Sequence, residues 1–272
     1  MLFPLSVLFG AFVGFALGLT GGGGSLLAVP LLVYGLAIAP REAFGVSLAA
    51  VGATALVGVI PRIRSGQVEL GTGVLFAVAG MLGAPLGTWI AGMIPETVLL
   101  GLFSVLMLVV AWRMWNKSQT KNEESLRAAC DKETRGPTCH RTEDGKLRLT
   151  SRCAMLLGVV GLTTGFLSGM FGVGGGFVIV PALVLFSGMS IHRAVATSLL
   201  VIMLVSISGV ASHFAAGRGI SLEVTGLFVV GGVIGMSFGG LVSKRLPTPA
   251  LQKVFATGIV AVAIFIVSKI FV

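Results

Sequence analysis

Apolar residues lie in long runs along this chain, and almost no charged residue interrupts them. Examples are residues 4–20, 71–94 and 222–242. A helix needs about 20 apolar residues to cross the roughly 30 Å of hydrocarbon in a bilayer. Within lipid the backbone must satisfy its own hydrogen bonds, so runs of this length are expected to be helices. The pattern predicts an all-α, polytopic integral membrane protein.

The chain also contains an internal repeat. A shift of 151 residues, from Gly10 to Gly161, aligns its two halves and keeps glycines, prolines and serines in register. The matched positions include Gly14 and Gly165, Gly24 and Gly175, Pro30 and Pro181, and Ser47 and Ser198. Chance similarity between apolar helices would not preserve so many of these residues. We therefore expect two homologous repeats, at residues 1–115 and 153–272, joined by a polar linker at residues 116–152.

Each repeat contains a first helix, a glycine-rich break, a short apolar segment and three longer segments. The short segments, residues 25–38 and 177–189, either cross the membrane or re-enter it, so each repeat has four or five transmembrane segments. Five segments would make the two repeats inverted relative to each other. That option places Arg62, Arg64 and Arg193 on the same side as the basic linker, which we expect to face the cytoplasm. The charge pattern therefore favours inverted repeats.

Composition narrows the class of protein further. Hydrophobic residues make up 55% of the chain and charged residues 11%, whereas a soluble domain carries about 25% charged residues. The net charge of +9 does not indicate nucleic-acid binding, because ten of the 19 Lys and Arg residues lie at 113–152 in and beside the linker. The three cysteines, Cys130, Cys139 and Cys153, lack a fourth ligand for a zinc site. We therefore expect no metal and no cofactor.

The two glycine-rich breaks are the best candidate site. Each glycine costs a helix about 1 kcal/mol, so the chain is expected to unwind at residues 21–24 and 172–176. The helix that starts after each break offers N–H groups and a positive dipole end to an anion. Two such ends converge near the membrane midplane in many secondary transporters. The alternative is that these glycines only allow close helix crossing. The candidate binding residues here are Gly22, Gly23, Gly24, Ser25, Gly174, Gly175 and Gly176.

Other polar residues in or beside apolar segments are weaker candidates. Ser47 and Ser198 occupy equivalent positions, and Thr197 lies beside Ser198. Their hydroxyls could donate to an anion, or they could bond to a carbonyl of their own helix. Arg41 and Arg193 begin equivalent helices and could reach a substrate anion, or they could extend toward the membrane interface.

Enzyme activity is not expected. Ser168 would need a base, but none of the three histidines is linked to it by a recognisable pattern. No Gly-Lys-Ser/Thr follows the glycines, so an ATP-binding loop is absent from the sequence and transport would depend on a gradient. No carboxylate lies deep in an apolar segment. The sequence leaves open whether a proton or another ion is coupled, and whether the chain forms a homo-oligomer.

The motif Gly172-Val173-Gly174-Gly175-Gly176, followed by residues 180–181 and 194–199, resembles the sulfite exporter TauE/SafE family, also known as toluene sulfonate uptake permeases. Residues 21–24, 29–30 and 43–48 repeat the pattern in the first half, with Gly45-Val46 in place of Ala-Thr. The resemblance covers nearly the whole chain apart from the linker. It implies transport of a small sulfur-containing anion such as sulfite or an organosulfonate like sulfoacetate.

We therefore expect a secondary transporter in the cytoplasmic membrane that works by alternating access. The resemblance favours export, although the family includes importers, and the exact solute stays open. An anion channel on the same scaffold and a membrane scaffold subunit without a solute are the alternatives. A channel would conduct without saturating, and a scaffold subunit would tolerate the loss of the hydroxyls of Ser47 and Ser198.

Overall fold

The computed structural model describes residues 2–127, 151–187, 189–217, 219–242, 257–263 and 266, and all regular structure among them is helical. An irregular helix between α1 and α3 combines a 3₁₀ turn, an α turn and a π turn. The elements in chain order are α1 (Leu2–Thr20), η1 (Gly23–Leu27), α2 (Ala28–Pro30), η2 (Leu31–Gly35), α3 (Pro40–Arg64), α4 (Leu70–Met93), α5 (Glu96–Arg127), α6 (Ser151–Phe171), α7 (Gly176–Ser187), α8 (Ile191–Ala215) and α9 (Leu222–Val242). Residues 257–263 form a further helical segment.

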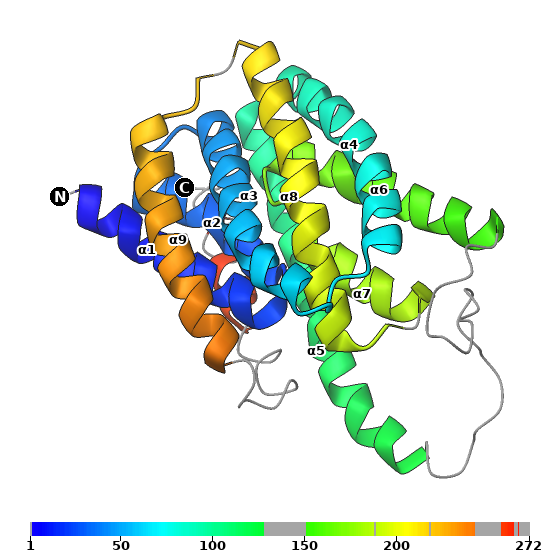
Figure 1. Cartoon of the computed structure of the whole chain (residues 1–272). Helices are drawn as coiled ribbons and strands as arrows, with labels where there is room; N and C mark the ends of the chain where they lie inside the picture. The colour runs from blue at the N-terminus through cyan, green and yellow to red at the C-terminus, as the bar shows by residue number, and fades with distance from the viewer. Residues whose placement is uncertain are drawn as a thin grey trace.

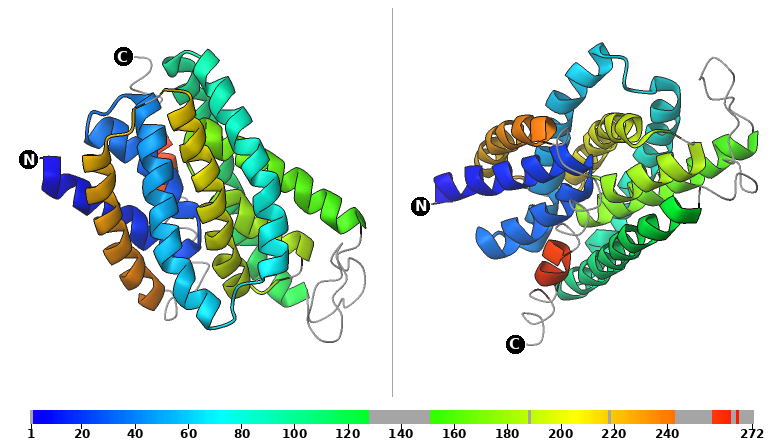
Figure 2. Two further views of the ribbon diagram at one scale, coloured as in Figure 1. Left: turned by 45° about the horizontal axis from the view of Figure 1, so that its top comes forward. Right: turned by 90° about the horizontal axis from the view of Figure 1, so that it is seen from below.

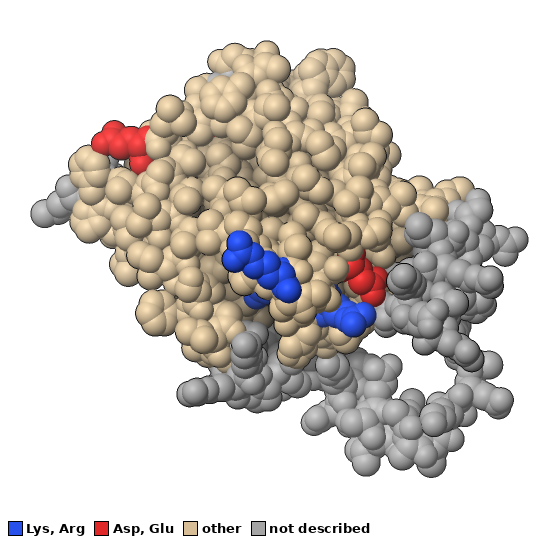
Figure 3. Space-filling view, viewed as in Figure 1, with Lys and Arg blue, Asp and Glu red and all other residues tan. Residues whose placement is uncertain are grey.

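Six of these helices are long and apolar enough to cross a membrane: α1, α3, α4, α6, α8 and α9. Their outer faces carry large apolar side chains. On α4, for example, Val78, Leu82 and Leu86 recur every four residues and are 52%, 65% and 54% exposed. Figure 3 shows the charged side chains of one face in two places, the lower middle and the upper left edge, with an uncharged surface between them. The all-helical, polytopic membrane fold predicted from the sequence is confirmed.

Glycines bring helices of the two repeats into backbone contact. A Cβ added to Gly14 of α1 would lie 2.6 Å from the Cα of Gly232 of α9. A Cβ added to Gly165 of α6 would lie 2.5 Å from the Cα of Gly80 of α4. Only glycine allows backbones to approach this closely. The two contacts are equivalent under the sequence repeat, so each repeat gives one helix to each of two tightly packed pairs, α1 with α9 and α4 with α6.

Neighbouring contacts also give the relative helix directions. Gly45 of α3 lies against His213 of α8, and Gly52 lies against Ser206, so α3 and α8 run antiparallel. Figure 1 shows this directly: α3 descends while α8 rises beside it. Gly10 lies against Phe228 and Gly18 against Met236, so α1 and α9 run in the same direction. Thr54 lies against Gly232 and Gly58 against Met236, so α3 and α9 also share a direction.

Because α1 and α3 share a direction, residues 21–39 must lead from the end of α1 back to the end of the bundle where α3 begins. The number of segments per repeat stays a prediction. Arg62, Arg64 and Arg193 then lie at the same end of the bundle, where α5 also ends, and Arg41 lies at the opposite end (Figure 1). The orientation in the membrane stays a prediction.

The largest difference from the expected segments concerns α5. The sequence predicted that the helix ends at residue 115, whereas it continues to Arg127 through the first part of the predicted linker. Residues 116–127 are rich in Lys, Gln, Glu and Arg, which favour a helix even without an apolar face. The remaining linker, with Cys130 and Cys139, and most of the predicted last segment lie outside the described residues.

Candidate functional site

The two glycine breaks meet in the middle of the bundle. The first break consists of Gly21 and Gly22, and the second of residues 172–175. Seen from below, α1 and α6 approach from opposite sides and end near the centre (Figure 2). A Cβ added to Gly22 would lie 2.6 Å from the carbonyl oxygen of Gly176, and one added to Gly176 would lie 2.5 Å from the Cα of Gly22. Residues 21–30 and 168–176 are all buried, so both breaks are closed to solvent in this conformation.

The first break is held by hydroxyl groups. Thr20 Oγ1 donates to the carbonyl of Ala16 at 2.8 Å and accepts the N–H of Gly23 at 2.9 Å. Ser25 Oγ donates to the carbonyl of Gly22 at 2.7 Å. The N–H of Gly23, predicted to be available to an anion, is therefore already bonded, and Gly23 and Gly24 belong to the 3₁₀ turn rather than to unwound chain.

The second break depends on left-handed backbone. Gly172, Gly174 and Gly175 have φ values of 68°, 69° and 69°, which side chains with a Cβ rarely adopt. The N–H of Gly172 donates to Ser168 O at 2.8 Å, and α7 begins at Gly176. Among the described residues, the N–H groups of Gly174, Gly175 and Gly176 donate no hydrogen bond that meets normal geometry. These donors lie at the start of a 12-residue helix, where the helix dipole favours an anion.

Ser47 and Ser198, the predicted symmetric pair, differ in their bonding. Ser198 Oγ donates to the carbonyls of Gly21 at 2.6 Å and Val195 at 2.8 Å, so its one proton is already used. Ser47 Oγ is buried and has no hydrogen-bond partner among the residues that the structure describes. The two equivalent residues therefore offer different chemistry to a ligand.

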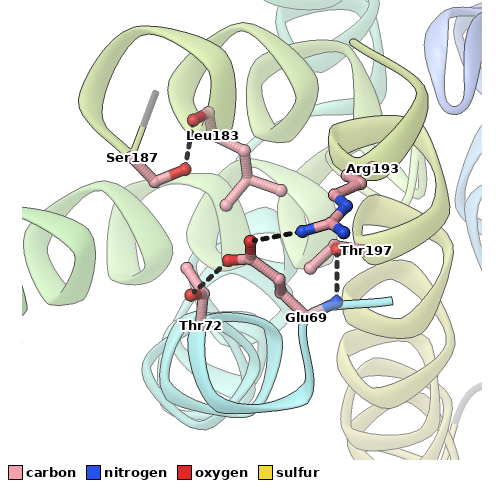
Figure 4. A network of polar contacts seen from close by, with 6 residues as sticks. All are labelled: Glu69, Thr72, Leu183, Ser187, Arg193 and Thr197. Carbon is pink, nitrogen blue, oxygen red and sulfur yellow. Dashed lines mark hydrogen bonds and ion pairs between the residues drawn. The ribbon is translucent and has the colours of Figure 1, made fainter. Parts of the chain in front are cut away.

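Thr197 and Arg193 lie in a polar network at the end of the bundle rather than at the breaks (Figure 4). The N–H of Glu69 donates to Thr197 Oγ1 at 3.1 Å, and Glu69 Oε1 lies 3.7 Å from Arg193 Nη1. Thr72 Oγ1 donates to the other carboxylate oxygen of Glu69 at 3.3 Å. The network joins the start of α4 to the first two turns of α8, so Arg193 connects these two helices.

Arg41 occupies the opposite end of the bundle. Its Nη2 donates to the carbonyl of Ile94 at 3.1 Å, and its Nε lies 3.6 Å from Glu96 Oε1. Beside it is an open pocket of about 450 Å³ lined by Ala39, Arg41, Glu42, Gly219, Ile220 and Ser221. Arg41 lies six residues before Ser47, or roughly 9 Å along the helix axis. Both guanidinium groups are therefore engaged by other residues, Arg41 by Ile94 and Glu96 and Arg193 by Glu69.

Two further serines near the second break were not chosen from the sequence as ligands. Ser168 and Ser206 are 1% and 2% exposed, and neither hydroxyl oxygen has a hydrogen-bond partner in the described part of the chain. Ser206 has no serine at the equivalent position, which is Ala55, so the repeat did not point to it. The sequence shows only a serine within an apolar helix. Most such serines donate their hydroxyl to a carbonyl of their own helix, so the pattern does not identify a ligand.

Comparison with known proteins identifies relatives over almost the full length. The family model described as "Sulfite exporter TauE/SafE" matches residues 6–266. A probable membrane transporter protein of Xylella fastidiosa strain Temecula1 is 37% identical over 264 residues, which cover 95% of this chain and 92% of the relative. A probable membrane transporter protein of Haemophilus influenzae is 30% identical, covering 96% of each chain.

A more distant relative, the probable membrane transporter protein YunE of Bacillus subtilis, is 25% identical over 93% of each chain. No solved structure matches. The resemblance seen in residues 172–176, 180–181 and 194–199 is thus confirmed, because the family model covers most of the chain. The six described helices that are long and apolar enough to cross a membrane agree with it. This chain belongs to the sulfite exporter TauE/SafE family of membrane transporters.

Proposed function

We propose that this protein moves a small sulfur-containing anion, such as sulfite or an organosulfonate, across the cytoplasmic membrane by alternating access. The observation that carries the proposal is the contact between the two breaks at Gly22 and Gly176. Unwound backbone survives at membrane depth only where protein or a wet cavity satisfies its polar groups. The N–H groups that start α7 are suited to an anion and lie at this contact.

The packing suggests how the site would open. The pairs α1 with α9 and α4 with α6 are held by backbone contacts through glycine, so each pair would move as a unit. The breaks end α1 and α6, one in each pair, and they are buried from both ends of the bundle. A relative tilt of the two pairs would separate the breaks toward one end at a time, which is alternating access. A solute or ion gradient would supply the energy.

The direct test is flux through the purified protein in liposomes. We expect sulfite or sulfoacetate loaded on one side to exchange for the same anion on the other side, with a rate that saturates as concentration rises. Liposomes without protein provide the baseline. A flux that grows linearly with concentration and shows no exchange would indicate an anion channel. No flux of either anion from well-folded protein would contradict the proposal and favour a scaffold subunit.

A further inference from the structure

Three hydroxyl groups of the described residues lie near the first break, and each donates a hydrogen bond to a backbone carbonyl. A serine or threonine hydroxyl has only one proton to donate. Thr20 donates its proton to Ala16 O, Ser25 to Gly22 O, and Ser198 to Gly21 O. An anion at this break would have to displace one of these bonds. The first break therefore has hydroxyls that hold its own backbone, and none that is ready for a ligand.

The second break lacks these backbone-holding hydroxyls. The residues equivalent to Thr20 and Ser25 are Phe171 and Gly176, which have no hydroxyl. The residue equivalent to Ser198 is Ser47, whose hydroxyl makes no bond within the described residues. Three buried serines near this break have hydroxyls with no hydrogen-bond partner in the described part of the chain: Ser47, Ser168 and Ser206, at 0%, 1% and 2% exposure. Buried polar groups are normally hydrogen-bonded, so three buried hydroxyls without a described partner around one break require an explanation.

Ser47 faces the second break from α3. The main chain of Phe44 lies against Gly172, and Val51 lies 3.2 Å from where a Cβ of Gly174 would be. Residues three and seven positions apart share one face of a helix, and Ser47 lies between Phe44 and Val51 on that face. Its hydroxyl is therefore on the side of α3 that covers the break.

Ser206 and Ser168 reach the same break from α8 and α6. Ser206 Oγ lies 3.9 Å from the position of a Cβ on Gly174, one helical turn after Ile202, which touches both Gly174 and Gly176. The Cβ of Ser168 lies 3.7 Å from the position of a Cβ on Gly175. Three helices thus each bring one uncommitted hydroxyl to a stretch of four residues that ends at the start of α7.

We infer that Ser47, Ser168 and Ser206 are the side-chain ligands of a small oxyanion at the second break, and that the first break has a structural role. The inference rests on the proposed function, because it assigns the ligands of that same site. Sulfite and sulfonate groups carry three oxygens, and each oxygen can accept more than one hydrogen bond, so the three hydroxyls and the N–H groups at the start of α7 can all donate to one anion. Ser47 belongs to the first repeat and the other two serines to the second, so the anion would join the repeats.

Single alanine variants of these serines test the inference. Alanine removes one donor to a charged ligand, so Ser47→Ala, Ser168→Ala and Ser206→Ala should each weaken sulfite binding by about 10- to 100-fold. The melting temperature without ligand should stay level or rise, because an unpaired buried hydroxyl is removed. The matched control is Ser104→Ala on α5, a serine buried to 1% exposure whose hydroxyl donates to Leu100 O at 2.9 Å. It should bind sulfite as tightly as the wild type.

Affinity is measured by titration calorimetry on detergent-purified protein with sulfite and with sulfoacetate, using chloride to detect unspecific anion binding. If the wild type binds and all three alanine variants bind equally tightly, the inference is wrong and the proposed function stands. If the variants lose affinity and melting temperature together, the serines are packing residues and the inference is also wrong. If the wild type binds neither anion, the proposed function fails and the inference fails with it.

Discussion

The contact between α4 and α6 allows a graded test of the fold along a single helix. Gly158, Gly161 and Gly165 all lie on α6, but their surroundings differ. A Cβ added to Gly158 meets nothing within 4 Å. One added to Gly161 would lie 2.7 Å from Phe76 O, and one added to Gly165 would lie 2.5 Å from the Cα of Gly80 and closer still to its carbonyl oxygen. Alanine at the three positions therefore adds the same methyl group, but its steric overlap with α4 increases from Gly158 to Gly161 to Gly165.

The expected effects follow from two opposing contributions. Replacing glycine by alanine inside a helix stabilises it by about 1 kcal/mol. Ordinary contact needs about 3.4 Å, so Gly161→Ala requires a shift of about 0.7 Å (3.4 − 2.7) and Gly165→Ala a shift of about 0.9 Å or more (3.4 − 2.5) between two backbones. Overpacking of this kind costs roughly 1–3 kcal/mol. Gly158→Ala should be neutral or stabilising, Gly161→Ala mildly destabilising, and Gly165→Ala destabilising by about 2 kcal/mol.

Thermal unfolding in detergent, followed by tryptophan fluorescence, provides the measurement. For a chain of this size each kcal/mol shifts the melting temperature by roughly 2–4 °C, so Gly165→Ala should melt about 4–8 °C below the wild type. Gly158→Ala should melt at or above the wild-type temperature. Equal melting temperatures for Gly158→Ala and Gly165→Ala would show that α6 does not contact α4 through Gly165, and the interlocked arrangement of the repeats would then be wrong.

Two further predictions concern the ends of the bundle. The linker end of the bundle is expected to face the cytoplasm. In a cysteine-free variant, Thr97→Cys should therefore react with an impermeant maleimide in intact cells, and Ser65→Cys should react only after permeabilisation. The reverse labelling pattern would show that the orientation is inverted. The side chain of Arg193 is about half exposed, and such an ion pair with Glu69 contributes about 0–1 kcal/mol. Arg193→Gln should therefore lower the melting temperature by no more than about 3 °C. A larger decrease would show that the polar network of Glu69 holds α4 and α8 together.

The sequence predicted the spans of the fold well because its signals were local. Apolar runs identified α4 and α9 to within two residues at each end, and the glycines marked both breaks. The partner of each glycine-rich helix face could not be predicted in this way. Gly14 and Gly165 were recognised as equivalent positions of the repeat, but nothing local indicates that α1 packs on α9. Such pairing depends on the directions of all the helices together.

Hydroxyl groups were predicted less well, for a related reason. The repeat suggested that Ser47 and Ser198 act alike, yet Ser198 donates to Gly21 O and Ser47 has no such partner among the described residues. Whether a buried hydroxyl is committed depends on a carbonyl from another segment, and sequence spacing does not reveal that carbonyl. Ser206 has alanine at its equivalent position, so a search for matched residues passes over it.

The two halves share the glycines of their helix contacts, whereas the polar residues at the two breaks differ. Helix pairs that meet through glycine backbones leave little room for a Cβ, and most of these positions are glycine in both halves. Polar positions carry no such constraint: Thr20 and Ser25 stabilise one break, while Phe171 and Gly176 leave the other without those groups. If the anion binds between Ser47 of α3 and the serines of α6 and α8, its ligands come from both repeats. A relative tilt of the α1–α9 pair and the α4–α6 pair would then change how many hydroxyls reach the anion, so the movement that opens the site would also weaken substrate binding.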